Sequence, residues 1–99
     1  MITKKASTKK GVVRVTFELP STMWAERVNL VGEFNDWRLY HHLLQQTQGD
    51  SDWHITLDLK AGRSYRFHYL VDGQEWMADN HADGHVLNSH GGVDCVVVT

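Results

Sequence analysis

The sequence is short of the residues that mark several classes of protein. Its 99 residues contain one cysteine and one proline. A single cysteine excludes an internal disulfide framework and fits a reducing compartment, so we expect a cytoplasmic protein. No apolar run approaches the length of a bilayer span, and the Lys-rich N-terminus lacks the apolar segment of a secretory signal. We therefore expect one domain with one core and no association with membranes.

Positive charge is scarce outside the N-terminus. Four of the ten basic residues are lysines within the first ten positions, whereas all twelve acidic residues come later. The rest of the chain thus has six basic against twelve acidic residues, a formal charge of −6. A body of this sign repels phosphate backbones, so nucleic acid is not an expected partner. We expect residues 1–11 to be a disordered basic tail or linker and residues 12–99 to form the domain.

A helical stripe is also missing, and alternation of apolar and polar residues takes its place. The alternation is clear in VVRVTFEL (12–19), WHITLDL (53–59) and YRFHYLV (65–71), and each run predicts a strand with one buried face. RVNLV (27–31) and VDCVVVT (93–99) are also typical of strands. Several short strands separated by turn signals, among them Asp72-Gly73, predict an all-β, antiparallel β-sandwich.

The four tryptophans fall into different settings. Trp53 is in phase with the apolar face of its strand, so we expect it in the core. Trp24 follows the single proline, and we expect it to cap one end of the sandwich. Trp37 follows a Phe-Asn-Asp turn, and Trp76 follows the predicted hairpin turn. These last two belong to no clear buried alternation, so they are the candidates for binding.

The surroundings of this tryptophan pair favour a sugar as the ligand. The apolar face of a pyranose stacks on an indole, while its hydroxyls bond to amides, carboxylates and imidazoles. Asn35 beside Trp37 and His68 on the polar face of its strand are candidate partners for those hydroxyls. Packing in the core is the commoner fate of a single tryptophan, and a surface histidine is usually only solvated. The pair, rather than either ring alone, supports the carbohydrate interpretation.

Four segments in order carry a resemblance to a known family. They are VNLVGEFNDW (28–37), the W-x-x-x-L-x-L-x-x-G run (53–62), YRFHYLVDGQEWMAD (65–79) and GGVDCVVVT (91–99). Together they resemble the family 48 carbohydrate-binding module over residues 12–99. This module occurs as the glycogen-binding domain of the AMP-activated protein kinase beta subunit. It also precedes the catalytic barrel of glycogen branching and debranching enzymes.

The resemblance implies an immunoglobulin-like β-sandwich of the early-set type that binds α-1,4-linked glucans without catalysis. It implies a sugar platform made by Trp37 and Trp76. The family has a lysine at the position of His68, a leucine near that of His90, and an asparagine at that of Asp94. These three residues are therefore implied at the polar rim of the site. Their departures from the family leave the affinity and the preferred chain length open.

Other interpretations remain open at this point. The module could instead dock on a glycogen-metabolising enzyme or a kinase subunit without binding glucan, and apolar residues of the last strand leave a weak homodimer open. A metal site at His81, Asp83 and His85, with His90 following, is disfavoured because this stretch lacks helical character. Glycoside hydrolysis needs two carboxylates across a cleft, and the acids here are scattered. We expect no enzyme activity, no metal and no cofactor.

Overall fold

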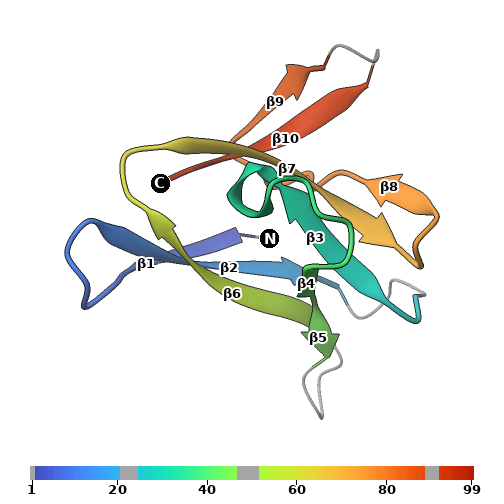
Figure 1. Ribbon diagram of the computed structural model, residues 1–99, viewed down its shortest axis with the longest axis horizontal. Helices are drawn as coiled ribbons and strands as arrows, with labels where there is room; N and C mark the ends of the chain where they lie inside the picture. Colours follow the sequence, from blue (N-terminus) through green and yellow to red (C-terminus); the bar gives the residue numbers. More distant parts are fainter. Residues whose placement is uncertain (1, 21–24, 47–51, 89–91) are drawn as a thin grey trace.

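The chain folds into two packed antiparallel sheets (Figure 1). A computed structural model describes residues 2–20, 25–46, 52–88 and 92–99. One sheet has the strand order β1-β2-β6-β5, and the other has the order β4-β3-β7-β10-β9 with β8 paired to β7. The elements are β1 (Ile2–Ala6), β2 (Val12–Leu19), β3 (Val28–Gly32), the 3-10 turn η1 (Glu33–Asn35), β4 (His42–Leu43), β5 (Gln45–Gln46), β6 (Trp53–Lys60), β7 (Ser64–Val71), β8 (Glu75–Met77), β9 (Gly84–Leu87) and β10 (Val93–Val98). The predicted all-β antiparallel sandwich is confirmed.

The core lies between the two sheets, where the alternating apolar faces meet. Phe17 of β2 and Phe67 of β7 are fully buried, and their ring centroids are 5.2 Å apart in an edge-on contact. Trp53 is buried in the same cluster, so its predicted core position is confirmed. Cys95 is also buried there as a free thiol. None of the described segments forms a helix with the length and apolar character of a membrane span.

The N-terminal residues differ from the expected disordered tail. Ile2–Ala6 form β1, which pairs antiparallel with β2. The Ile2 side chain packs against the core, and Lys4 Nζ lies 2.6 Å from Asp83 Oδ2 in an ion pair. The Lys-rich composition predicted a disordered tail, but lysines are also typical of edge strands. Here the segment pairs with the open edge of β2. Trp24 lies outside the described residues, as does His90.

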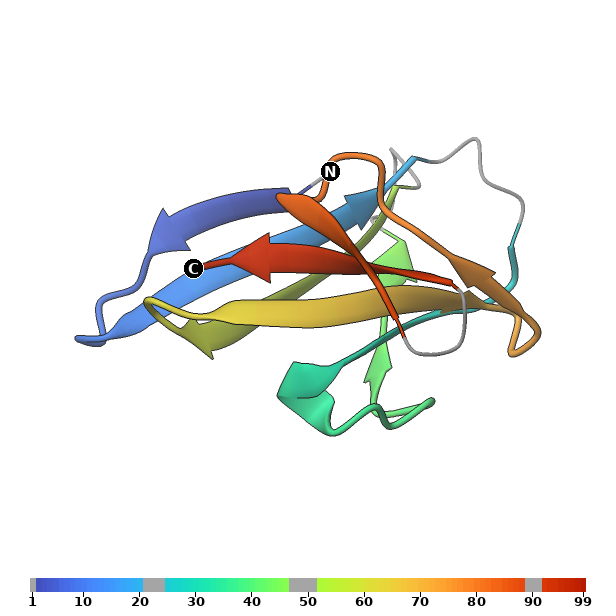
Figure 2. The same cartoon turned by 90° about the horizontal axis from the view of Figure 1, so that it is seen from above.

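The outer face of the six-stranded sheet brings three distant segments together. His68 lies on this face of β7, and Trp76 of β8 pairs with Leu70, two residues further along β7. The register of β10 against β7, continued by one residue, places Asp94 opposite His68. Figure 2 shows η1 and the chain after it on the side of this sheet away from β1 and β2. The turn that carries Trp37 is therefore on the same side as these residues.

Candidate functional site

A pocket of about 780 Å³ opens on this outer face. Four of the six residues predicted to bind sugar line it, namely Trp37, His68, Trp76 and Asp94. The other lining residues are Arg66, Met77, Ala78, Asn88, Gly92 and Val93. The two indoles are unusually open to solvent for tryptophan, with exposed fractions of 40% for Trp37 and 55% for Trp76. Both therefore offer apolar surface to a ligand.

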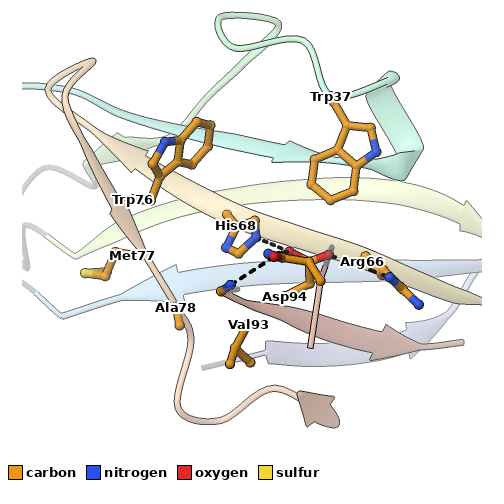
Figure 3. A pocket seen from close by; sticks show the side chains of 10 residues that line it. Trp37, Arg66, His68, Trp76, Met77, Ala78, Val93 and Asp94 are labelled. Carbon is orange, nitrogen blue, oxygen red and sulfur yellow. Dashed lines mark hydrogen bonds and ion pairs between the residues drawn. The ribbon is translucent and has the colours of Figure 1, made fainter. Parts of the chain in front are cut away.

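The two indoles flank a single imidazole. The ring centroid of His68 is 6.2 Å from that of Trp37 and 5.8 Å from that of Trp76. Figure 3 shows the indoles on either side of His68, one from the turn after η1 and the other from β8. The pocket thus offers two apolar faces with a hydrogen-bonding group between them. This arrangement suits a ligand that has both apolar faces and hydroxyl edges.

The turn that positions Trp37 is held by the side chain of Asn35. Asn35 Oδ1 accepts a hydrogen bond from the Gly32 amide at 3.1 Å, and Nδ2 donates to the Leu30 carbonyl at 2.9 Å. Nδ2 also lies 2.9 Å from Nδ1 of His42. Asn35 is buried and does not line the pocket, so the structure gives its amide a place inside the turn. Its predicted contact with sugar stays a prediction.

The backbone at Trp37 is in an uncommon conformation. Asp36 and Trp37 have φ angles of 56° and 60°, in the left-handed region that bulky side chains seldom adopt. The Trp37 amide donates to the Gly32 carbonyl at 2.9 Å, which closes the turn. Such conformations cost roughly 1–3 kcal/mol each and persist where the surrounding structure enforces them, often at binding sites. The Trp37 side chain that this turn carries lines the pocket.

Trp76 is positioned by the tight β7–β8 hairpin. Asp72 and Gly73 have φ angles of 52° and 67°, so the predicted hairpin turn is confirmed. Asp72 Oδ1 also accepts hydrogen bonds from the amides of Glu26 at 2.8 Å and Arg27 at 2.9 Å. These bonds tie the hairpin to the chain that enters β3. The hairpin therefore fixes Trp76 relative to the sheet that carries His68.

A buried carboxylate fixes the chain beyond β8. Asp79 is buried, and its Oδ2 accepts a hydrogen bond from the Tyr69 hydroxyl at 2.9 Å. Burial, followed by the nearby charge of Asp79, raises the pKa of the Tyr69 hydroxyl far above its ordinary value. The Asp79 amide lies 3.1 Å from Sγ of Cys95. This anchor holds Met77 and Ala78 at the wall of the pocket.

Asp94 lies at the floor of the pocket, and its carboxyl group is ionised. Its Oδ1 is hydrogen-bonded to His68 Nε2 and accepts from Asn88 Nδ2 at 3.0 Å, and Arg66 Nη1 lies 3.8 Å from Oδ2. Burial on its own raises the pKa of Asp94. The hydrogen bonds from Asn88 and His68, with the charge of Arg66 and that of His68 when it is protonated, outweigh burial and hold this pKa below its ordinary value. The carboxylate is therefore charged at neutral pH.

Sequence reasoning missed Arg66 and Asn88 as pocket residues. Arg66 could have been found, because it is two residues before His68 and shares its strand face. Asn88 follows β9, and its approach to Asp94 depends on the β9–β10 pairing, in which Asp94 is opposite Val86. No local sequence signal predicts that register. His90 lies outside the described residues, so its place at the site stays a prediction.

His81 and His85, which follow β8, do not line the pocket. Asp83 Oδ2 is paired with Lys4 and accepts the Val98 amide at 2.7 Å, and His85 Nε2 lies 3.0 Å from the Asp79 carbonyl. Within residues 2–20, 25–46, 52–88 and 92–99, no three side chains of His, Cys, Asp or Glu gather as a metal site. Asp83 thus has a structural role in joining β1 to the other sheet.

The lowered pKa of His42 is expected to make the stability of the domain depend on pH. Burial, and then the charge of His41, lower the pKa of His42 below its ordinary value of 6.5. Below about pH 6.5 the unfolded chain takes up this proton before the folded chain does, so stability falls as the pH decreases. We expect thermal unfolding between pH 7.5 and 5 to show a smaller pH slope in His42→Gln than in the wild type. Equal slopes for the two proteins would contradict this coupling.

Comparison with known proteins bears on this pocket. The family model described as the glycogen recognition site of AMP-activated protein kinase matches residues 10–98. No curated protein matches the chain. The matched range covers every described residue of the pocket, from Trp37 to Asp94.

Proposed function

Because the chain belongs to the family of glycogen recognition sites of AMP-activated protein kinase, we propose that it binds α-1,4-linked glucans in the pocket between Trp37 and Trp76. The observation that carries this proposal is the pair of half-exposed indoles on either side of His68. Each indole accepts the C–H face of one glucose ring. The imidazole between them meets the hydroxyls at the edge of the sugar.

The chain acts as a binding module and not as an enzyme. Hydrolysis of a glycosidic bond requires two carboxylates about 5–10 Å apart across the bond. Among the described lining residues the single carboxylate is Asp94, and its oxygens are held by His68, Asn88 and Arg66. A pocket floor with this single carboxylate is suited to binding a sugar and not to hydrolysing a glycosidic bond.

Weak binding to many chain ends would target the module to a polysaccharide. A shallow site on one sheet face gives modest affinity for a short oligosaccharide, because association costs offset each small contact. A branched polymer offers many chain ends to one module, so the apparent affinity rises through effective concentration. An attached or partner protein, such as a glycogen-metabolising enzyme or a kinase subunit, is thereby held at the polysaccharide.

A fluorescence titration tests the binding proposal. Maltoheptaose or β-cyclodextrin should change the tryptophan emission in a saturable way, because two of the four indoles exchange solvent for sugar. Cellopentaose, which has β-1,4 linkages, is the control ligand and should have a much smaller effect. A folded protein whose emission and heat of mixing are unchanged by every α-glucan would reject the proposal in favour of a docking module.

A further inference from the structure

The orientation of the His68 ring is set by a carboxylate that is almost inaccessible to a ligand. Asp94 is only 6% exposed, and its Oδ1 is hydrogen-bonded to His68 Nε2. The same oxygen accepts from Asn88 Nδ2 at 3.0 Å, and Arg66 Nη1 lies 3.8 Å from the other oxygen. These contacts surround the carboxylate on the protein side. Oδ2 accepts no hydrogen bond from the residues that the structure describes, so burial of Asp94, and not a lack of lone pairs, is what limits its contact with a sugar hydroxyl.

The chemistry of this contact determines which ring nitrogen holds the proton. A carboxylate can only accept hydrogen bonds, so a neutral His68 must have its proton on Nε2 in order to donate to Asp94. The other nitrogen, Nδ1, is then an acceptor. Nδ1 makes no hydrogen bond with any residue that the structure describes, and the ring lines the pocket between the two indoles. It is the ring atom that remains for a ligand.

We propose that Asp94 is a positioning residue, which acts on glucan binding through His68 by holding Nδ1 as an acceptor in the pocket. The inference rests on the proposed function of the pocket and deepens it. A glucose hydroxyl donates to Nδ1, whereas Asp94 itself does not contact the sugar. The pocket thus selects a ligand that donates a hydrogen bond at the point between its two stacked rings.

Two measurements on the free and bound protein test this division of roles. Nitrogen-15 NMR of the imidazole at pH 7.5 should show the Nε2–H tautomer for His68 in the wild type. Asp94→Leu is a variant of similar size that cannot accept from Nε2, so the preference of the ring for the Nε2–H tautomer should be lost. Maltoheptaose binding by this variant should be about tenfold weaker, since the ring is then no longer held in one tautomer and orientation.

A double-mutant cycle separates positioning from direct contact. His68→Ala should also weaken maltoheptaose binding about tenfold, and His68→Ala/Asp94→Leu should be no weaker than His68→Ala alone. Additive losses would overturn the proposal, because they would mean that Asp94 touches the sugar itself. An Nδ1–H tautomer in the wild type would overturn it as well, and that result needs no variant. Wild-type protein that binds no glucan would instead reject the proposed function, while normal binding by a folded Asp94→Leu variant would reject this inference alone.

Discussion

Replacing Trp37 or Trp76 with alanine is expected to weaken glucan binding by about tenfold to a hundredfold and to leave the fold intact. Burial of a large apolar side chain contributes about 1.5–3 kcal/mol, and each 1.4 kcal/mol changes a dissociation constant tenfold. Both indoles are half exposed, so their removal opens no large cavity in the core. Isothermal titration with maltoheptaose measures the loss in affinity, and thermal unfolding checks the fold.

Tyr40→Ala is the matched control for these variants. Tyr40 is an exposed aromatic residue of the same surface segment, with an exposed fraction of 64%, but it does not line the pocket. Its replacement should leave the affinity within about twofold of the wild type. Equal losses in the Tyr40 and Trp37 variants would point to a diffuse apolar surface. Unchanged affinity in both tryptophan variants would remove these side chains from the site.

Replacing Gly32 with alanine is expected to lower the free energy of unfolding by about 3 kcal/mol, because a methyl group does not fit there. A Cβ at this position would lie 2.7 Å from the Arg66 carbonyl oxygen, 2.8 Å from Phe34 Cζ and 2.9 Å from Phe67 Cβ. The φ angle of Gly32 is −168°, which any residue adopts, so the effect is one of space. For a domain of this size the melting temperature should fall by about 10–20 °C.

Gly84→Ala separates this clash from the general effect of removing a strand glycine. The nearest atom to a Cβ at Gly84 is Val96 Cβ at 3.8 Å, an ordinary contact. We expect the free energy of unfolding of Gly84→Ala to stay within about 0.5 kcal/mol of the wild type.

Gly32→Ala should also weaken maltoheptaose binding, because the Gly32 carbonyl accepts a hydrogen bond from the Trp37 amide. Equal stability of the two variants would show that the β3–η1 junction can relax around the methyl group.

Much of the fold could be predicted because the apolar alternation reports directly on which face of a strand is buried. The alternation predicts Trp53 in the core, and it is there. Strand β1 could not be predicted, because Ile2 is its one clear apolar anchor among lysines and threonine. Its position depends on an open edge of β2, which is a property of the folded sheet.

The candidate site could be predicted in its aromatic part and less well in its polar part. The turns around Trp37 and Trp76 have local signals, since glycine, asparagine and aspartate mark tight backbone conformations. The polar floor depends on strand register, which brings Asp94 opposite His68 and Asn88 within hydrogen-bonding distance of Asp94. Asn35 shows the limit of local reasoning, because an amide next to an exposed ring can serve the turn and face away from the ligand.

The indole N–H signals in a nitrogen-15 NMR spectrum test the glucan-binding pocket most directly. The four tryptophans should each give one indole N–H signal, and single Trp→Phe variants would assign them. Addition of maltoheptaose should shift the Trp37 and Trp76 signals along one saturation curve and leave that of buried Trp53 in place. Shifts confined to other tryptophans, or no shift at a saturating concentration of the glucan, would contradict binding between Trp37 and Trp76.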